Sequence, residues 1–272
     1  MITEQRMWTK GKGWEIISNN NLKDNAQLVF LFGDSTLLKA PQNFSEVKEF
    51  YPNAHIVSGS TAGEIIGTQV LDYSLVVTAI NFTNTPLQFA KSKIQKMEDS
   101  LTVGETLANA LSKEGLVHVM VFSDGLRVNG TNLVKGLIGK LPKEVAVTGG
   151  LVGDQDRFKE TFVGLDSVPE QDNLAVIGFY GTHIKIGYGS MGGWDPFGPE
   201  RLVTKSKDNV LYELDGQSAL ELYKKYLGDQ AKELPASGLL FPLSLRIEGK
   251  KTGLVRTILA VSDQDGSMTF AG

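Results

Sequence analysis

The chain contains no cysteine among its 272 residues, and this absence removes several kinds of chemistry at once. Disulfides, thiolate metal sites, a cysteine nucleophile and thiol redox reactions are all excluded. Histidine is scarce as well, with three residues, and no two of them have the i, i+4 spacing of a helical zinc site. We therefore expect no metal and no cofactor.

Long apolar runs and basic patches are also missing. The amino-terminal segment has no continuous apolar stretch of the kind found in secretion signals. No later stretch approaches the roughly eighteen apolar residues in a row that a membrane-spanning helix needs. The formal net charge is −4, which argues against general affinity for nucleic acid. We expect a soluble, cytoplasmic protein with no nucleic-acid or membrane partner.

What the chain does contain is an internal repeat, in residues 27–64 and 117–154. Val29–Ser35 lines up with Val119–Gly125, and Ser58–Glu64 lines up with Thr148–Asp154, both at an offset of ninety residues. The intervening segment matches in length and in apolar spacing. An internal duplication is the simplest explanation.

Each copy of the repeat predicts a strand, a helix and a second strand. An apolar run ends in Gly-Asp-Ser or Ser-Asp-Gly, which is typical of a buried strand entering a turn. Helices are expected at 43–51 and 132–141, each ended by a proline, with short strands at 55–58 and 145–148 leading into glycine-bearing loops. The pattern predicts an α/β fold with layered mixed sheets and helices outside.

The remaining sequence predicts further strands and a domain boundary. Strands are expected at 75–81, 87–94, 174–180 and 184–188, where β-branched residues are frequent. After Gly198 the sequence contains a polar stretch at 204–209. A strand is expected at 211–216, followed by a helix at 217–227. We expect a lead-in at 1–24, a first domain at 25–210 and a smaller second domain from 211 to 272.

Four acids occupy matching places in the two copies. Glu64 and Asp154 follow the glycine turns, and Asp34 and Asp124 follow the first strands. Each carboxylate could accept hydrogen bonds from a ligand ammonium. Each could equally cap a helix or stabilise its own turn, which is the commoner use of an acid in such a place.

The complementary half of the predicted site would bind a carboxylate. Glycine-rich turns present backbone N–H groups to anions, and Arg127 is the one cation near the proposed pocket. The residues in question are Ser60, Thr61, Gly63, Arg127, Asn129, Gly149 and Gly150. Arg127 could instead be a solvated loop side chain. Neither loop has the spacing of a nucleotide-binding motif.

Several of these segments resemble the FIST sensory proteins. The segments are Ser58–Ile65, Ser123–Gly125 with Asn129-Gly130, Thr148–Gly150 with Gly153-Asp154, and Tyr212–Gly216 with Ala219-Leu220. The resemblance implies an N domain and a smaller C domain that sense a small ligand, with amino acids as the ligand class usually proposed. It also implies a separate signalling partner, such as a histidine kinase or a cyclic-dinucleotide enzyme.

Two departures from the family pattern bear on the alternatives. The C domain lacks the family's closing motif after Met268 and is therefore expected to be truncated. Some members bind haem and sense nitric oxide, but Met191-Gly192 stands where they often carry a histidine. His183 would be the axial ligand if haem binds. A hydrolase is a more distant alternative, because no serine has the flanking glycines of a nucleophile elbow. No enzyme activity is expected.

Overall fold

The computed structural model describes residues 1–189, 193–248 and 254–271. The chain forms two compact units, Met1–Gly187 and Tyr188–Gly272. This division lies earlier in the chain than the predicted boundary at 210/211. Each unit is described by itself.

The first sheet of the first unit has six strands in the order β11-β4-β3-β7-β1-β2. The neighbours β3 and β4 are parallel, and the other pairs are antiparallel. Helices α1 (Ser35–Leu38) and α2 (Pro41–Phe50) connect β3 to β4. The strands are β1 (Ile2–Thr9), β2 (Gly13–Ser18), β3 (Leu28–Gly33), β4 (His55–Ser60), β7 (Ser74–Asn81) and β11 (Val163–Leu165).

The second sheet has four strands in the order β10-β9-β12-β8, and β9 and β10 are its parallel pair. Helix α4 (Gly130–Lys140) connects β9 to β10, and α3 (Ser100–Asn109) precedes β9. The strands are β8 (Leu87–Lys93), β9 (Leu116–Ser123), β10 (Ala146–Leu151) and β12 (Asn173–Tyr180). A separate hairpin joins β5 (Glu64–Ile66) to β6 (Gln69–Leu71).

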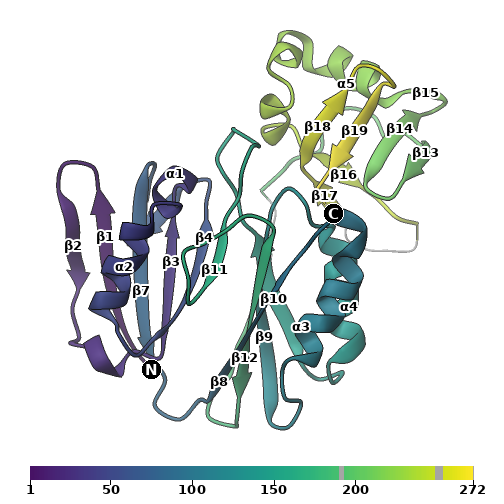
Figure 1. Cartoon of the computed structure of the whole chain (residues 1–272). Coiled ribbons are helices and arrows are strands. Elements are labelled where there is room, and N and C mark those ends of the chain that lie inside the picture. The colour runs from purple at the N-terminus through teal and green to yellow at the C-terminus, as the bar shows by residue number, and fades with distance from the viewer. Residues whose placement is uncertain (190–192, 249–253, 272) are drawn as a thin grey trace. The chain divides into compact units, whose positions relative to one another are not determined.

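The two sheets pack face to face, with helices on their outer faces (Figure 1). The inner core contains residues from both sheets, and the Phe30 and Phe122 rings lie 5.7 Å apart. A second core lies between α2 and the first sheet, around Leu31, Val47 and Tyr51. A third lies between the second sheet and helices α3 and α4. The predicted layered α/β fold with helices outside is confirmed.

Two glycines allow α3 and α4 to pack closely. A Cβ atom on Gly136 would overlap the carbonyl oxygen of Leu101, and a Cβ atom on Gly104 would overlap that of Leu133. Both glycines are buried, so the two backbones lie in direct contact. Small residues are required here because any side chain would push the helices apart.

The two predicted repeats share one pairing pattern. Leu31 pairs with Val77 and Ser58 in the first sheet, and Val121 pairs with Val176 and Gly149 in the second. Ser58 of β4 and Gly149 of β10 therefore occupy equivalent positions in the two sheets. Their numbers differ by 91 (149 minus 58), one more than the offset in the sequence alignment. The duplication of the chain itself stays a prediction.

Some predicted elements have different bounds. Strands β4 and β10 continue to Ser60 and Leu151, so Gly59, Gly149 and Gly150 lie inside strands and not in loops. The predicted strand at 184–188 is wrong, because this segment has no strand pairing. Ile184 and Ile186 still pack against the inner core, which explains the apolar alternation that predicted a strand.

The second unit is a small α/β structure. One sheet has the order β13-β14-β19-β18, with β15 (Gln217–Ser218) beside β14, and β16 (Leu243–Leu245) pairs with β17 (Leu254–Arg256). Helix α5 (Ala219–Leu227) begins at the cap residue Ser218 and packs on that sheet through Leu220 and Tyr223. The strands of the sheet are β13 (Val203–Lys207), β14 (Val210–Leu214), β18 (Ile258–Ser262) and β19 (Ser267–Phe270).

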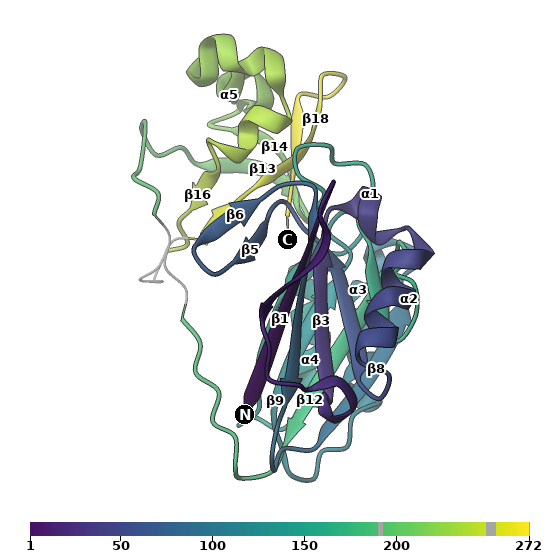
Figure 2. The same ribbon diagram turned by 90° about the vertical axis from the view of Figure 1, so that its left-hand side faces the viewer.

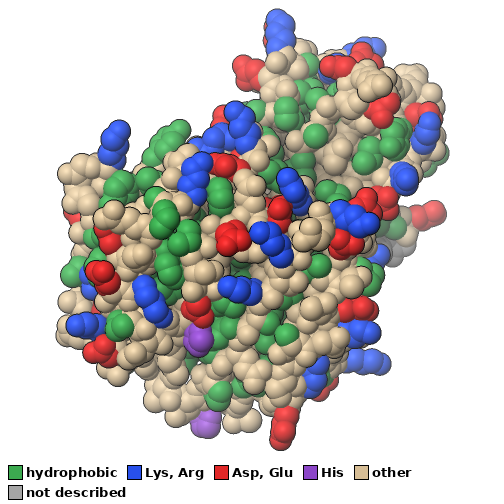
Figure 3. All heavy atoms as spheres, in the orientation of Figure 1, with side chains coloured by type: hydrophobic (Ala, Val, Ile, Leu, Met, Phe, Trp, Pro, Cys, Tyr) green, Lys and Arg blue, Asp and Glu red, His purple; other side chains and the backbone are tan. Residues whose placement is uncertain are grey.

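The surface shows charges of both signs. On the face drawn in Figure 3, basic and acidic side chains are interspersed over the first unit. Among the helices within the described ranges, none is long and apolar enough to cross a membrane.

Candidate functional site

The loops after β4 and β10 lie against each other. The Gly153 N–H donates to the Ser60 carbonyl at 3.0 Å, and the Ser60 N–H donates to the Phe162 carbonyl at 3.0 Å. The Phe162 N–H donates to the Ser60 Oγ, also at 3.0 Å. The segment 152–162 therefore joins the carboxyl ends of strands from both sheets. We call this region, with the turns after β3 and β9, the loop cluster.

Asp34 is a fully buried carboxylate of the loop cluster. It caps α1 by accepting from the Thr36 N–H at 2.8 Å, and the Thr36 hydroxyl also donates to it. Arg157 Nη2 lies 2.8 Å from Asp34 Oδ2 and donates to Ser35 Oγ as well. Burial alone would raise the pKa of Asp34, but the hydrogen bonds from Thr36 and the hydrogen bond and charge of Arg157 hold this pKa below its usual value.

This lowered pKa predicts a pH-dependent contribution to stability. Ionised Asp34 stabilises the fold above its unfolded-state pKa of 3.8, and that stabilisation is lost as the pH falls through the lower folded-state pKa. We expect Asp34→Asn to lower the free energy of unfolding by about 2 kcal/mol at pH 7. The difference between wild type and variant should shrink below about pH 4 in urea titrations. A difference that is constant from pH 7 to pH 3 would contradict the assignment.

Asp124 and Asp154 hold the turns in which they lie. Asp124 Oδ1 accepts from the N–H groups of Leu126 at 2.8 Å and Arg127 at 2.7 Å, and the Thr161 hydroxyl donates to Oδ2 at 2.6 Å. Asp154 accepts from three consecutive N–H groups, those of residues 158–160, at 2.8–3.2 Å. Both carboxylates are buried. These contacts match the turn-stabilising alternative that the sequence left open.

Glu64 closes the base of the β5–β6 hairpin. Its carboxylate accepts from the Thr61 hydroxyl at 2.6 Å and from the Ser74 hydroxyl at 2.7 Å, so it ties together the residues on either side of the hairpin. Gly63 beside it has a φ of +147°, a conformation that favours glycine. The hairpin projects from the first sheet (Figure 2), and its paired Ile65 and Val70 are 70% and 72% exposed.

The other predicted ligand residues have separate side-chain or backbone contacts in the turn after β9 and on β10. Arg127 is exposed, and its Nε lies 3.2 Å from Asp172 Oδ1 at the start of β12. Asn129 caps α4 by accepting from the Asn132 N–H. Gly149 and Gly150 are exposed on β10, where they pair with β9.

The residues of the alternative functions also have clear positions. His183 is exposed in the segment after β12. Ser60 and Ser123 are buried and hydrogen-bonded to backbone atoms. Within the ranges that the structure covers, no three His, Asp or Glu side chains converge to hold a metal ion. Met191 and Gly192 lie outside the described residues.

Sequence reasoning missed three residues of the loop cluster, Gln155, Arg157 and Thr161. Arg157 and Thr161 hold the two equivalent acids Asp34 and Asp124. The buried Nε2 of Gln155 has no hydrogen-bond partner among the described residues, and Gln155 adopts the left-handed φ of +64°. These residues follow the second copy of the repeat, which ends at residue 154, so the repeat gave no equivalent position to compare.

Comparison with protein families covers most of the chain. Residues 27–217 match the model of the FIST N domain, and residues 219–272 match that of the FIST C domain. The comparison with curated proteins gave no match.

Proposed function

Since the chain belongs to the FIST family, whose domains are sensory domains of signalling proteins, we propose that it senses an amino acid or a related metabolite at the loop cluster. The observation that carries the proposal is the joining of equivalent turns from two sheets by residues 152–162. In α/β sheets, ligands commonly bind at the carboxyl ends of strands.

The proposed contacts use the residues whose polar groups remain available. Arg157 is held by Asp34, and its side chain is 24% exposed, so its guanidinium can meet a ligand carboxylate. Gln155 Nε2, which is buried and has no hydrogen-bond partner among the described residues, can donate to the same ligand once its side chain turns outward. Exposed Asp156 supplies an anion for a ligand ammonium. Asp34, Asp124, Asp154 and Glu64 then act indirectly, by fixing the turns.

This proposal includes no catalytic step and no haem. A signal follows only if the ligand binds two arrangements of the loop cluster with different affinity. The β5–β6 hairpin, tied to the cluster through Glu64, is the element that we propose changes position. A separate protein, such as a histidine kinase or a cyclic-dinucleotide enzyme, would read that change.

A thermal-shift screen of the twenty standard amino acids tests the proposal. One of them at about 100 times its Kd should raise the melting temperature by about 5–10 °C. Arg157→Lys keeps a cation beside Asp34 but loses the guanidinium fork, and should abolish the rise. Lys159→Gln, an exposed change in the same segment, should preserve it.

Two results would contradict the proposal. One is a screen without any stabilising amino acid, and the other is a rise that persists unchanged in Arg157→Lys. A saturable Soret band after haem addition, lost in His183→Ala, would instead favour the gas sensor.

A further inference from the structure

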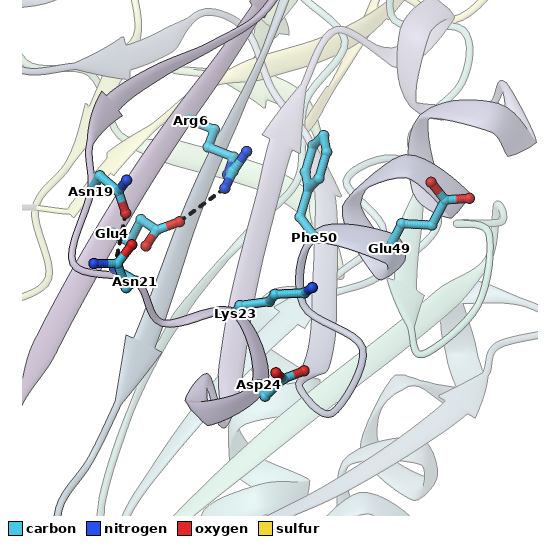
Figure 4. A pocket seen from close by; sticks show the side chains of 8 residues that line it. All are labelled: Glu4, Arg6, Asn19, Asn21, Lys23, Asp24, Glu49 and Phe50. Carbon is cyan, nitrogen blue, oxygen red and sulfur yellow. Dashed lines mark hydrogen bonds and ion pairs between the residues drawn. The ribbon is translucent and has the colours of Figure 1, made fainter.

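A hollow of about 650 Å³ lies on the first unit, lined by residues of β1, of the segment that follows β2 and of the end of α2. Its volume is that of a small-molecule site. Most of its lining residues precede residue 27, where the FIST N match begins. Figure 4 shows Arg6 between Glu4 and Phe50, with Lys23 extending toward the α2 side of the opening.

Arg6 is fixed on one side of this hollow. Its Nη2 donates to Glu4 Oε1 at 3.2 Å, and its Nε donates to the Tyr51 hydroxyl oxygen at 3.0 Å. Its guanidinium carbon lies 4.4 Å from the centre of the Phe50 ring. Nη1 has no hydrogen-bond partner within the part of the chain that the structure describes. A guanidinium held in this way loses little conformational entropy when it binds an anion.

Glu4 is the support that keeps Arg6 in place. It is 1% exposed, and its carboxylate accepts from the Tyr51 hydroxyl at 2.7 Å and from the N–H groups of Asn20 and Leu22 at 3.3 and 3.1 Å. Burial alone would raise the pKa of Glu4, but these hydrogen bonds and that from Arg6 lower it. Burial and the hydrogen bond to Glu4 raise the pKa of Tyr51 to about 12. Both groups therefore keep one protonation state at neutral pH.

The charges around the opening decide the ligand class. Glu4 offsets the charge of Arg6, and the remaining charges of the lining are those of Lys23, Asp24 and Glu49, all three exposed. A simple anion would meet this pair of carboxylates, and a simple cation would meet Arg6 and Lys23. A molecule that carries both a negative and a positive group can pair with the basic side chains and with the carboxylates at the same time. We infer that the hollow binds a small zwitterion, with its carboxylate on Arg6 and Lys23 and its ammonium on Glu49 and Asp24.

This proposed site is independent of the loop cluster. The following titration, which is read out at Arg6, distinguishes binding in the hollow from binding at the loop cluster. Amino acids are titrated into ¹⁵N-labelled full-length protein, with the Arg6 Nε–Hε signal as the readout. Amino-acid amides, which carry only the cation, and the matching carboxylic acids, which carry only the anion, serve as comparison probes. We expect saturable shifts of Arg6 and of residues 19–24 with an amino acid, and at least tenfold weaker binding of both comparison probes.

The hollow variants and the Lys10 control use exposed residues, so that folding is preserved. Lys23→Gln and Glu49→Gln should each weaken binding at Arg6 at least tenfold, whereas Lys10→Gln in the turn between β1 and β2 and Arg157→Lys should leave it unchanged. Absence of a saturable shift, equal binding of the amides or carboxylic acids, or insensitivity to both hollow variants would overturn the inference. Loss of binding at Arg6 in Arg157→Lys would overturn its independence. The loop-cluster proposal is tested separately, by whether the rise in melting temperature is lost in Arg157→Lys.

Discussion

Gly136→Ala should lower the free energy of unfolding by about 3 kcal/mol. The new methyl group would overlap the Leu101 carbonyl oxygen, and α3 and α4 would have to separate. The atoms in the way belong to the backbone, so no side-chain rotation can make room. Overpacking of this kind typically costs about 1–3 kcal/mol, and the closeness of the contact places this case at the upper end. Urea unfolding followed by circular dichroism measures the change.

The same helix supplies a matched control. Gly139 also lies in α4, but nothing lies within 4 Å of the position that its Cβ would occupy. Gly139→Ala should therefore stabilise the protein by about 0.5–1 kcal/mol, since alanine has the higher helix propensity. Equal effects of the two substitutions would show that the helices do not meet at Gly136.

Asp154→Ala should cost about 3 kcal/mol and loosen the loop cluster. The substitution removes the acceptor of three backbone N–H groups, and hydrogen bonds to a charged group each contribute about 1.5–3 kcal/mol. Exposed Lys159 can turn its N–H to water, which limits the loss. Hydrogen exchange should become faster for the amides of residues 158–160, and unfolding in urea gives the free energy.

Asp156→Ala is the control for this second change. Asp156 lies two residues away in the same turn, but its side chain is exposed. We expect an effect within about 0.5 kcal/mol and unchanged amide exchange at residues 158–160. If Asp156→Ala were as damaging as Asp154→Ala, the stability of the turn would depend on its total charge and not on the three hydrogen bonds.

Local patterns in the sequence predicted the repeated strand–helix–strand units of the first unit, but not β1 and β2, which lie in the segment 1–24 that was expected to be a lead-in. Apolar runs followed by Gly-Asp-Ser or Ser-Asp-Gly gave β3 and β9, and helices ended by proline gave α2 and α4. These elements are readable because burial period and chain-breaking residues act over a few positions. The family resemblance rested on the same segments and is confirmed.

The sequence by itself therefore determined the class of fold and the family. Only the tertiary structure decided what the polar residues of the first unit do. Asp34 is matched by Arg157, 123 residues away, and Glu4 by Tyr51, 47 residues away. The partner of a buried charge is set by how distant segments pack, because desolvation must be offset by whichever donor the fold brings near. The spacing of residues along the sequence does not show which distant segments will pack together.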